Sequence, residues 1–476
     1  MVFNSFAFIV FFPLVTLLYF LLPHKFRWLL LLISSCVFYA WFKVEYLFIL
    51  VFTIIVDYYA ALWMEKLEGQ KRKWALIASI VANLGVLAVF KYANFMIASL
   101  NALLTRGGQE PFDLLNILLP IGLSFHTFQA MSYTIEVYRG NQKSEKNVFR
   151  YALYVMFYPQ LVAGPIERPQ HVIHQFYEEH KFDYHRATSG LRLMMWGMFK
   201  KVVIADRVAV YVDQVYDHPF EYSGLPIIVA TILFSFQIYC DFSGYTDIGI
   251  GAARVMGFDL MKNFERPYFS KSLSEFWRRW HISLSSWFRD YVYIPLGGNR
   301  VNNFRRYFNL LIVFMLSGLW HGASWNYVIW GTLHGVYLVG GQLTQNIQNK
   351  VIGFIKIPLL QKAIHAGMVF GLVGISWVFF RARTFSGSKH LLKHFFMKSS
   401  HSVSQIIDDI RWHQLVIIIA AIALMEGVQW AQRTKSIGVW YDAQPKWFRW
   451  SGYYLLFIGI ILFATYSNTQ FIYFQF

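Results

Sequence analysis

Long apolar segments separated by short polar intervals recur from one end of this chain to the other. The clearest lie at residues 6–22, 29–42, 47–64, 74–89, 227–239, 308–320, 328–343, 366–380, 415–425 and 453–466. Less regular ones lie at residues 115–131, 151–162 and 191–210. An α-helix needs roughly 20 such residues to cross a bilayer. The pattern therefore predicts an all-α polytopic membrane protein with about 11 to 13 membrane-embedded helices, re-entrant segments included.

Composition supports this fold class. Hydrophobic residues make up 56% of the 476 residues, charged residues only 14%, and the mean hydropathy is +0.39. A soluble domain carries about 25% charged residues. Because no internal repeat and no Pro- or Ser-rich linker divides the chain, we predict a single membrane domain over residues 1–476, with its central motifs at about 237–345.

Basic residues between the first apolar segments indicate an orientation. The first segment has no basic region before it and no small-residue cleavage site after it, which favours a retained helix over a signal peptide. Lys25 and Arg27 follow this segment, and a denser cluster, Lys66 with residues 71–73, follows the third. Positive charge marks cytoplasmic loops. We therefore expect the N-terminus outside.

The formal net charge of +17 does not indicate a nucleic-acid partner. Many of the 43 basic residues stand in short loops between apolar segments, where they set topology and meet anionic lipid headgroups. No clustered basic face of the kind that binds nucleic acid is evident. Cys36 and Cys240 are the two cysteines. They provide neither a disulfide framework nor metal-ligand spacing, so we expect no metal site.

The middle of the chain combines charge, glycine and aromatic residues in a way that its ends do not. Two sets at helical spacing stand out in it: an aromatic and apolar stripe, and a second face that carries charge and hydroxyl groups. The stripe is Phe276, Trp280, Leu284, Trp287 and Tyr291; the second face is Arg278, His281, Ser285 and Arg289. The spacing predicts one helix that lies in the interface or lines a polar cavity. A purely structural interfacial anchor is the alternative.

His281 and His321 are the leading candidates for chemistry. An ionisable group at the end of an apolar run is costly in a membrane unless it is used, although a single buried histidine is more often structural. Imidazole has a reference pKa of about 6.5 and removes a proton from a hydroxyl near neutral pH. Acyl transfer from a thioester to an alcohol needs such a base, together with a donor to the oxyanion.

Two other classes of function remain open at this stage. Haem ligation would use histidine pairs, but His321 and His334 fall about 140° apart around one helix, and no facing helix offers a clear second pair. A transporter or lipid flippase would suit many spans around a polar centre, but no inverted repeat is evident. A quinone redox protein belongs with the haem alternative.

These residues together resemble the membrane-bound O-acyltransferase family. Its signature pairs an Asn, Asp or His with a later Trp-His-Gly histidine, and here His281 ends Phe276-Trp277-Arg278-Arg279-Trp280-His281 while His321 lies in Trp320-His321-Gly322. Further matching stretches are residues 158–166, 241–247, 289–299 and 471–476. The run Pro295-Leu296-Gly297-Gly298-Asn299-Arg300 is most similar to the bacterial alginate O-acetyltransferase branch, which includes peptidoglycan and cellulose O-acetylation proteins.

The resemblance implies an enzyme of the bacterial cytoplasmic membrane that takes an acyl group, most simply acetyl from acetyl-CoA, and delivers it outward through a central tunnel. It implies His321 as the essential histidine and His281 as its partner, no tightly bound cofactor, and an extracytoplasmic acetyl-accepting protein. We expect substrate or tunnel roles for Trp277, Arg278, Trp280, Arg289, Asn299, Trp320, Trp325 and Asn326.

Charged groups in the same region have more ordinary explanations as well. Arg278, Arg279, Arg289 and Arg300 suit CoA phosphates, because guanidinium pairs with phosphate through two hydrogen bonds. Each arginine also sets topology or pairs locally, as Glu275 and Arg279 do at i, i+4 spacing. We expect the carboxylates to pair with neighbouring arginines and backbone amides and not to act as bases; they are Asp241, Asp247, Glu265 and Asp290.

Overall fold

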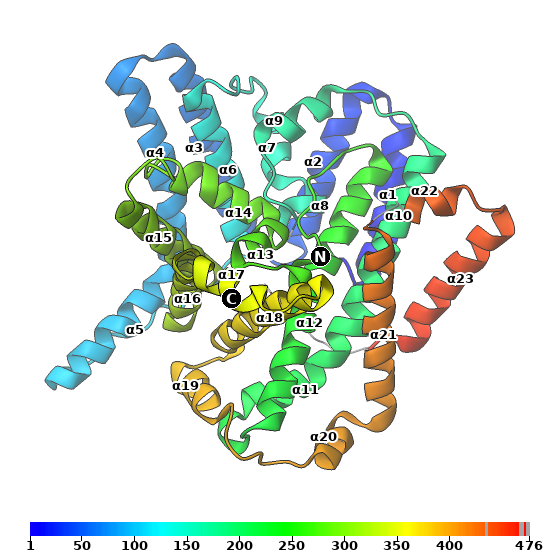
Figure 1. The fold of residues 1–476 in the computed structure, drawn as a ribbon. Coiled ribbons are helices and arrows are strands. Elements are labelled where there is room, and N and C mark those ends of the chain that lie inside the picture. Colours follow the sequence, from blue (N-terminus) through cyan, green and yellow to red (C-terminus); the bar gives the residue numbers. More distant parts are fainter. Residues whose placement is uncertain (163, 434–436, 466–470, 473–476) are drawn as a thin grey trace. The chain divides into compact units, whose positions relative to one another are not determined.

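The computed structural model describes residues 1–162, 164–433, 437–465 and 471–472, and every regular element in these ranges is a helix (Figure 1). Five helical segments are long and apolar enough to cross a membrane: α3 (Tyr46–Lys66), Gly69–Gly107, α12 (Leu225–Met256), α18 (Pro358–Arg381) and α21 (Trp412–Ala431). Among the shorter helices, α1 (Phe6–Leu21) is also apolar. An all-α polytopic membrane protein is thereby confirmed. The count of 11 to 13 embedded helices and the central tunnel stay predictions.

The chain forms two compact units. The first comprises Met1–Met194 and Tyr245–Met261, and the second comprises Met195–Gly244 and Lys262–Phe476. Two helices, α10 (Tyr184–Met198) and α12, contribute to both units. The single membrane domain predicted from the sequence stays a prediction.

A buried polar group joins two helices of the first unit. Asp57 of α3 is fully buried and accepts hydrogen bonds from Ser79 Oγ (2.6 Å) and Asn83 Nδ2 (2.8 and 2.9 Å). Buried polar groups need such partners, so this contact fixes α3 against α4. The other helices of the unit are α2 (His24–Ala40), α4 (Gly69–Leu87), η1 (Ala88–Tyr92), α5 (Ala93–Leu104), η2 (Thr105–Gly107), α6 (Leu123–Arg139), α7 (Val148–Met156), α8 (Tyr158–Leu161), α9 (Pro169–Val172) and η3 (Ile173–Tyr177).

The apolar segment at residues 115–131 is helical over only part of its length. Residues 111–120 form no regular structure, and α6 begins at Leu123. Pro120 removes a backbone donor, and Gly122 adopts the left-handed φ of 76° as the N-cap residue of α6. The continuous apolar pattern hid this break, because hydropathy alone does not register backbone geometry.

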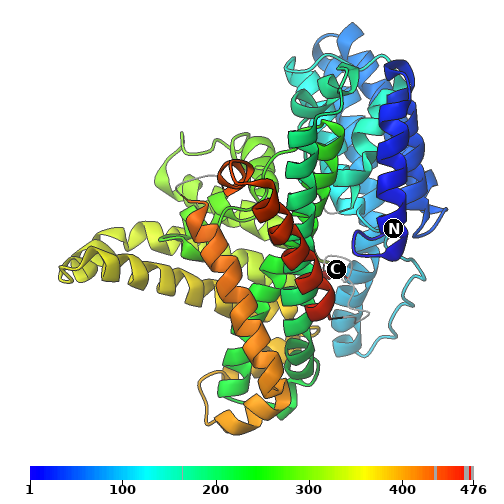
Figure 2. The same ribbon diagram turned by 90° about the vertical axis from the view of Figure 1, so that its right-hand side faces the viewer.

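The second unit contains a closely packed pair of helices, α15 (Asn303–His321) and α16 (Trp325–Leu343), joined by a three-residue turn (Figures 1 and 2). A Cβ on Gly318 would lie 2.1 Å from the carbonyl oxygen of Tyr327, and one on Gly331 would lie 2.1 Å from that of Phe314. Glycine at both positions lets the backbones approach this closely. The contact fixes the end of α15, where His321 stands.

The second unit contains further helices and helical turns. They are η4 (Phe199–Ala205), α11 (Asp206–Asp217), η5 (Pro219–Glu221), η6 (Pro267–Phe269), α13 (Leu273–Arg279), α14 (Ile282–Phe288), η7 (Arg289–Tyr293), α17 (Gln345–Gly353), α19 (Phe385–His394), α20 (Val403–Ile410), α22 (Ile437–Asp442) and α23 (Lys446–Phe463). Helices α19 and α20 lie between the candidate spans α18 and α21 in sequence. Ser402 begins α20 with a capping box to Gln405.

Candidate active site

The two candidate histidines lie side by side in the second unit. His281 is in the turn between α13 and α14, and His321 is the last residue of α15. Their ring centroids are 6.1 Å apart, and the residues are 0% and 3% exposed. Two imidazoles from distant parts of the sequence thus share one water-poor environment.

The turn that carries His281 corrects the prediction of one continuous helix from Phe276 to Tyr291. Helix α13 ends at Arg279, and His281 takes the left-handed φ of 44° before α14 begins. The aromatic periodicity continued across this break because both short helices bury their apolar faces. The two predicted faces are therefore not faces of one helix.

Asn263, which the sequence did not single out, holds this turn in place. Its backbone carbonyl accepts from Ile282 N at 2.9 Å, and its Oδ1 accepts from the backbone N and the hydroxyl of Ser283 at 3.1 and 3.0 Å. Asn263 is 1% exposed. A loop asparagine far from His281 in sequence gives no signal of this role, because the contact exists only in the fold.

Aromatic rings enclose both imidazoles. Phe242 of α12 lies 4.7 Å from His281, and Trp320 lies 5.9 Å from it, centroid to centroid. Trp330 and Phe380 lie 5.0 and 5.4 Å from His321. Trp320 was predicted as part of this wall. Trp330 and Phe380 were not, because they occupy ordinary apolar positions of α16 and α18.

Exclusion of water has a chemical consequence for His281. Burial lowers its pKa, because the charged imidazolium loses its hydration. The ring is therefore neutral near pH 7, which is the form that accepts a proton from a hydroxyl. The arrangement suits general-base chemistry on a substrate that reaches the pair.

The other predicted tryptophans have different surroundings. The Trp277 indole donates to His334 Nδ1 at 3.3 Å, and its ring lies 5.9 Å from that of Trp330. Trp280 precedes His281 and packs 5.2 Å from Trp377. Trp325 is 57% exposed at the start of α16. Trp277 and Trp280 thus form a second layer behind the inner rings.

The predicted polar residues lie apart from the buried pair. Arg278, Arg289 and Asn299 are exposed, and Arg289 pairs with Asp290 at 2.7 Å. Asn326 is buried, but it donates to the carbonyl of Ala382 at 2.9 Å and so ties α16 to the end of α18. Their substrate roles stay predictions.

Two of the charged residues considered above form ion pairs within the protein. Arg279 contacts Glu275 at 2.6 Å across one helical turn. Asp241 lies 2.7 Å from Lys201 Nζ and accepts from the backbone N of Ile472 at 2.7 Å. Its carboxylate therefore neutralises a buried cation, here a lysine and not an arginine.

The arrangement of His334 bears on haem ligation. His321 and His334 lie on two different helices, so their angular separation around one helix does not apply. Both ring nitrogens of His334 have protein partners, Trp277 at Nδ1 and Ser376 Oγ at 2.9 Å from Nε2. Within the described ranges, no group of three or more His, Cys, Asp or Glu residues is arranged to hold a metal ion.

The fold and the buried pair define a helical membrane protein with a site suited to proton transfer from a hydroxyl. The chain belongs to the membrane-bound O-acyltransferase family, and the family model matches residues 139–356. It is an acyltransferase of the branch whose members O-acetylate polysaccharide or peptidoglycan. Among the stretches that carried the resemblance, residues 163 and 473–476 lie outside the described ranges.

Individual relatives agree with this branch. The chain is 40% identical to the "probable alginate O-acetylase" of Pseudomonas aeruginosa over 85% of its own length and 77% of the relative's. It is 32% identical to the peptidoglycan O-acetyltransferase of Helicobacter pylori over 94% and 91% of the two lengths. Identity to the teichoic acid D-alanyltransferase of Bacillus subtilis is 28%, over 47% and 59%. The run from Pro295 to Arg300 indicated the same O-acetyltransferase branch.

Proposed function

We propose that this chain takes an acetyl group from acetyl-CoA on the cytoplasmic side and delivers it across the bacterial cytoplasmic membrane for O-acetylation of a polysaccharide or peptidoglycan. The observation that carries the proposal is the buried pair His281 and His321, with ring centroids 6.1 Å apart inside an aromatic enclosure. The names of the relatives, an alginate O-acetylase and a peptidoglycan O-acetyltransferase, support this class of acceptor.

In this proposal His321 is the general base. It takes the proton of the acceptor hydroxyl as the hydroxyl oxygen attacks the acetyl carbonyl, and the thiolate of CoA leaves as the thioester bond breaks. His281 lies close enough to orient the acceptor or to donate to the developing oxyanion. Enclosure by Trp320, Trp330 and Phe380 limits competing hydrolysis by water.

The acceptor in this proposal meets the acetyl group from the outer side. CoA is too polar and too large to cross the bilayer, whereas an acetyl group is small. A tunnel with a cytoplasmic and an outer opening, with the histidines at its narrowest point, would satisfy both requirements. The exposed arginines Arg278 and Arg300 are our candidates for the CoA phosphates, since guanidinium suits phosphate. A separate extracytoplasmic protein is the proposed recipient.

Transfer of label from acetyl-CoA labelled in the acetyl group tests the proposal. Purified protein in lipid nanodiscs is assayed with and without candidate extracytoplasmic acceptor proteins. We expect wild-type protein to release CoA and to transfer label. His321→Ala should reduce transfer by about 10² to 10⁴-fold, the usual contribution of a positioned base.

The control variant is His185→Ala, which removes an exposed imidazole in α10. It should retain wild-type turnover. Normal turnover by His321→Ala would overturn the role of His321. Substrate movement that survives in that variant without CoA release would favour a transporter, because transport needs no general base.

A further inference from the structure

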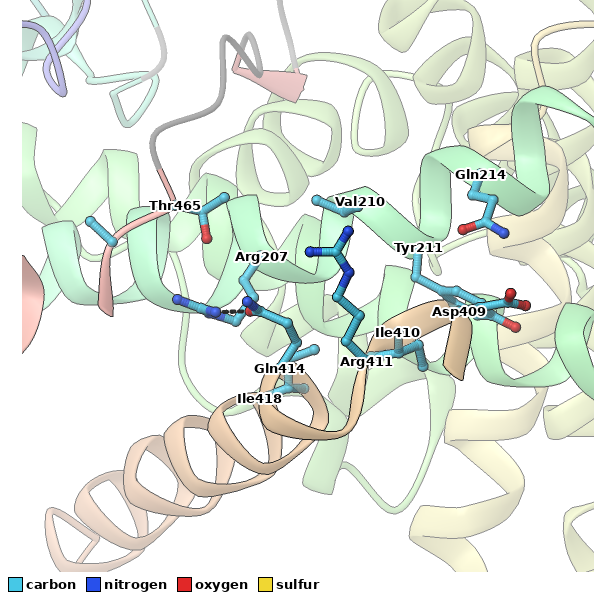
Figure 3. Close-up of a pocket in the computed structure, with 11 residues that line it drawn as sticks. Arg207, Val210, Tyr211, Gln214, Asp409, Ile410, Arg411, Gln414, Ile418 and Thr465 are labelled. Atoms are coloured by element: carbon cyan, nitrogen blue, oxygen red, sulfur yellow. Dashed lines mark hydrogen bonds between the residues drawn. The ribbon is translucent and has the colours of Figure 1, made fainter. Parts of the chain in front are cut away.

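A cavity of about 580 Å³ lies in the second unit, apart from the histidine pair (Figure 3). It is formed by α11, the junction between α20 and α21, and the residues that follow α23. Its volume is within the roughly 300–1,000 Å³ of small-molecule sites. None of its lining residues has a place in the acetyl-transfer mechanism proposed above.

Arg207 supplies a buried positive charge to this cavity. It is 8% exposed, and its guanidinium donates to two neutral acceptors, Gln414 Oε1 and the carbonyl of Phe463. In the part of the chain that the structure describes, its Nε has no hydrogen-bond partner, and no carboxylate forms an ion pair with it. A buried cation without an anion is costly, so the cavity favours an anionic ligand.

Tyr211, one turn along α11, supplies a hydroxyl donor that points to the same conclusion. The residue is 2% exposed and lines the cavity, and its hydroxyl has no hydrogen-bond partner among the described residues. Buried hydroxyl groups are normally hydrogen-bonded. A ligand with acceptor oxygens in the cavity would satisfy this group.

Arg411 adds a second guanidinium from the other side of the cavity. Figure 3 shows its side chain extending from the start of α21 toward the face of α11 that carries Val210. One carboxylate, that of Asp409, also lines the space. Two guanidinium groups against one carboxylate leave the cavity positive.

The position of the cavity along the helices suggests where such an anion would come from. Helix α21 is one of the five candidate spans, and its first residue, Trp412, is 66% exposed. Exposed tryptophan at the end of a span is typical of the membrane–water interface. Apolar Val210 and Ile418 line the same space. Lipid phosphates lie at this level of a bilayer.

We propose that Arg207, Arg411 and Tyr211 form a binding site for a phosphate group, carried either by a membrane lipid or by a soluble phosphate ester. The guanidinium groups pair with two phosphate oxygens each, and the phenol donates to a third oxygen or to the ester oxygen. The apolar lining accepts the first carbons of a lipid glycerol or acyl group. This site is independent of acetyl transfer.

Lipid binding to the detergent-purified full chain, followed by native mass spectrometry, tests this site. The probes are dioleoyl phosphatidylglycerol, dioleoylglycerol, which lacks the phosphate, and glycerol phosphate, which lacks the acyl chains. We expect phosphatidylglycerol to bind and dioleoylglycerol not to bind. Arg411→Gln, at an exposed position, should weaken binding by about tenfold, the loss of one bidentate charge-assisted contact.

Matched variants separate the cavity from general attraction to anionic lipid. Arg433→Gln removes an exposed arginine just beyond the other end of α21 and should leave binding unchanged. Arg207→Gln should also weaken binding, but loss of this buried side chain can prevent folding. Tyr211→Phe tests the same cavity, because it should weaken binding without unfolding the protein. If glycerol phosphate binds as tightly as phosphatidylglycerol, the phosphate group in this site comes from a soluble phosphate ester. Three results would overturn the site. Dioleoylglycerol could bind as tightly as phosphatidylglycerol, or Arg433→Gln could lose as much binding as Arg411→Gln. The third result is that neither phosphate probe binds.

Discussion

At the scale of single residues, His281 combines a candidate chemical role with an uncommon backbone. Its φ of 44° lies in the left-handed region, where a side chain other than glycine costs about 1–2 kcal/mol and asparagine is tolerated best. The backbone N–H groups of the two following residues, Ile282 and Ser283, donate to Asn263 and hold the turn in this conformation. The imidazole is thus aimed by backbone geometry.

Two substitutions separate the backbone from the side chain at this position. His281→Asn should keep the free energy of unfolding close to wild type, whereas the β-branched His281→Val should lower it by about 1–2 kcal/mol because of the left-handed φ. His281→Val should also impair acetyl transfer, because valine has no group that donates or accepts a hydrogen bond. Denaturant unfolding in detergent gives the stabilities, and equal stability of the two variants would contradict the backbone argument.

His171 and Glu167 make the stability of the first unit depend on pH. The hydrogen bond from His171 Nδ1 to Glu167, 2.8 Å long, raises the pKa of His171, and burial raises the pKa of Glu167. When the folded-state pKa of a group lies above its unfolded-state pKa, the group's stabilising contribution is fully present below the unfolded-state pKa, which is 6.5 for histidine. That contribution is lost as the pH rises through the folded-state pKa. Because both pKa values are raised, His171 and Glu167 both lower the stability of the folded protein as the pH rises.

We therefore expect the thermal midpoint of the purified protein to fall as the pH rises above 6.5, because this histidine then loses its proton. His171→Gln should flatten that part of the profile, while His174→Gln, an exposed neighbour, should not. Differential scanning fluorimetry at fixed ionic strength provides the measurement. A profile of unchanged slope in His171→Gln would exclude this pair as the cause.

At the scale of elements, the packing of α15 on α16 fixes the end of α15 and so places His321. Gly318→Ala puts a methyl group 2.1 Å from a backbone carbonyl oxygen that has little freedom to move. Gly340→Ala on α16 meets nothing within 4 Å. The two substitutions are chemically identical and differ only in their surroundings.

We predict opposite effects of these two variants. Gly340→Ala should stabilise the protein by up to about 1 kcal/mol through helix propensity. Gly318→Ala should destabilise it by about 1–3 kcal/mol through overpacking and reduce acetyl transfer by displacing His321. Unfolding and turnover are measured on both variants. Wild-type turnover in Gly318→Ala would show that α15 tolerates a shift without moving its histidine.

The same elements show what sequence can and cannot predict. The Trp-His-Gly motif and the paired histidine were evident from residue types, and the apolar periods placed α1, α3, α15 and α16 close to their observed bounds. The break at His281 was not evident, because it depends on Asn263, which the fold brings there. Trp330 and Phe380 were missed for a related reason, since an apolar ring beside a buried site looks like any core residue in sequence.

At the scale of the whole molecule, orientation in the membrane decides which side of the chain meets CoA and which meets the glycan. The positive-inside rule places Lys25, Arg27 and the cluster at residues 66–73 in the cytoplasm. Since α1, α2 and α3 follow one another with short connections, the two basic regions agree on a single orientation. We therefore predict that the N-terminus lies outside.

Single cysteines test this orientation in a Cys36→Ser, Cys240→Ser background that retains acetyl transfer. Asn4→Cys, just before α1, should react with a membrane-impermeant maleimide in intact cells. Gln70→Cys, beside the lysine cluster at the start of α4, should react only after the membrane is permeabilised. The reverse pattern would place the basic loops outside. A cytoplasmic thioester donor would then have to enter from the side of the N-terminus, so the same labelling also determines which opening of the proposed tunnel faces acetyl-CoA.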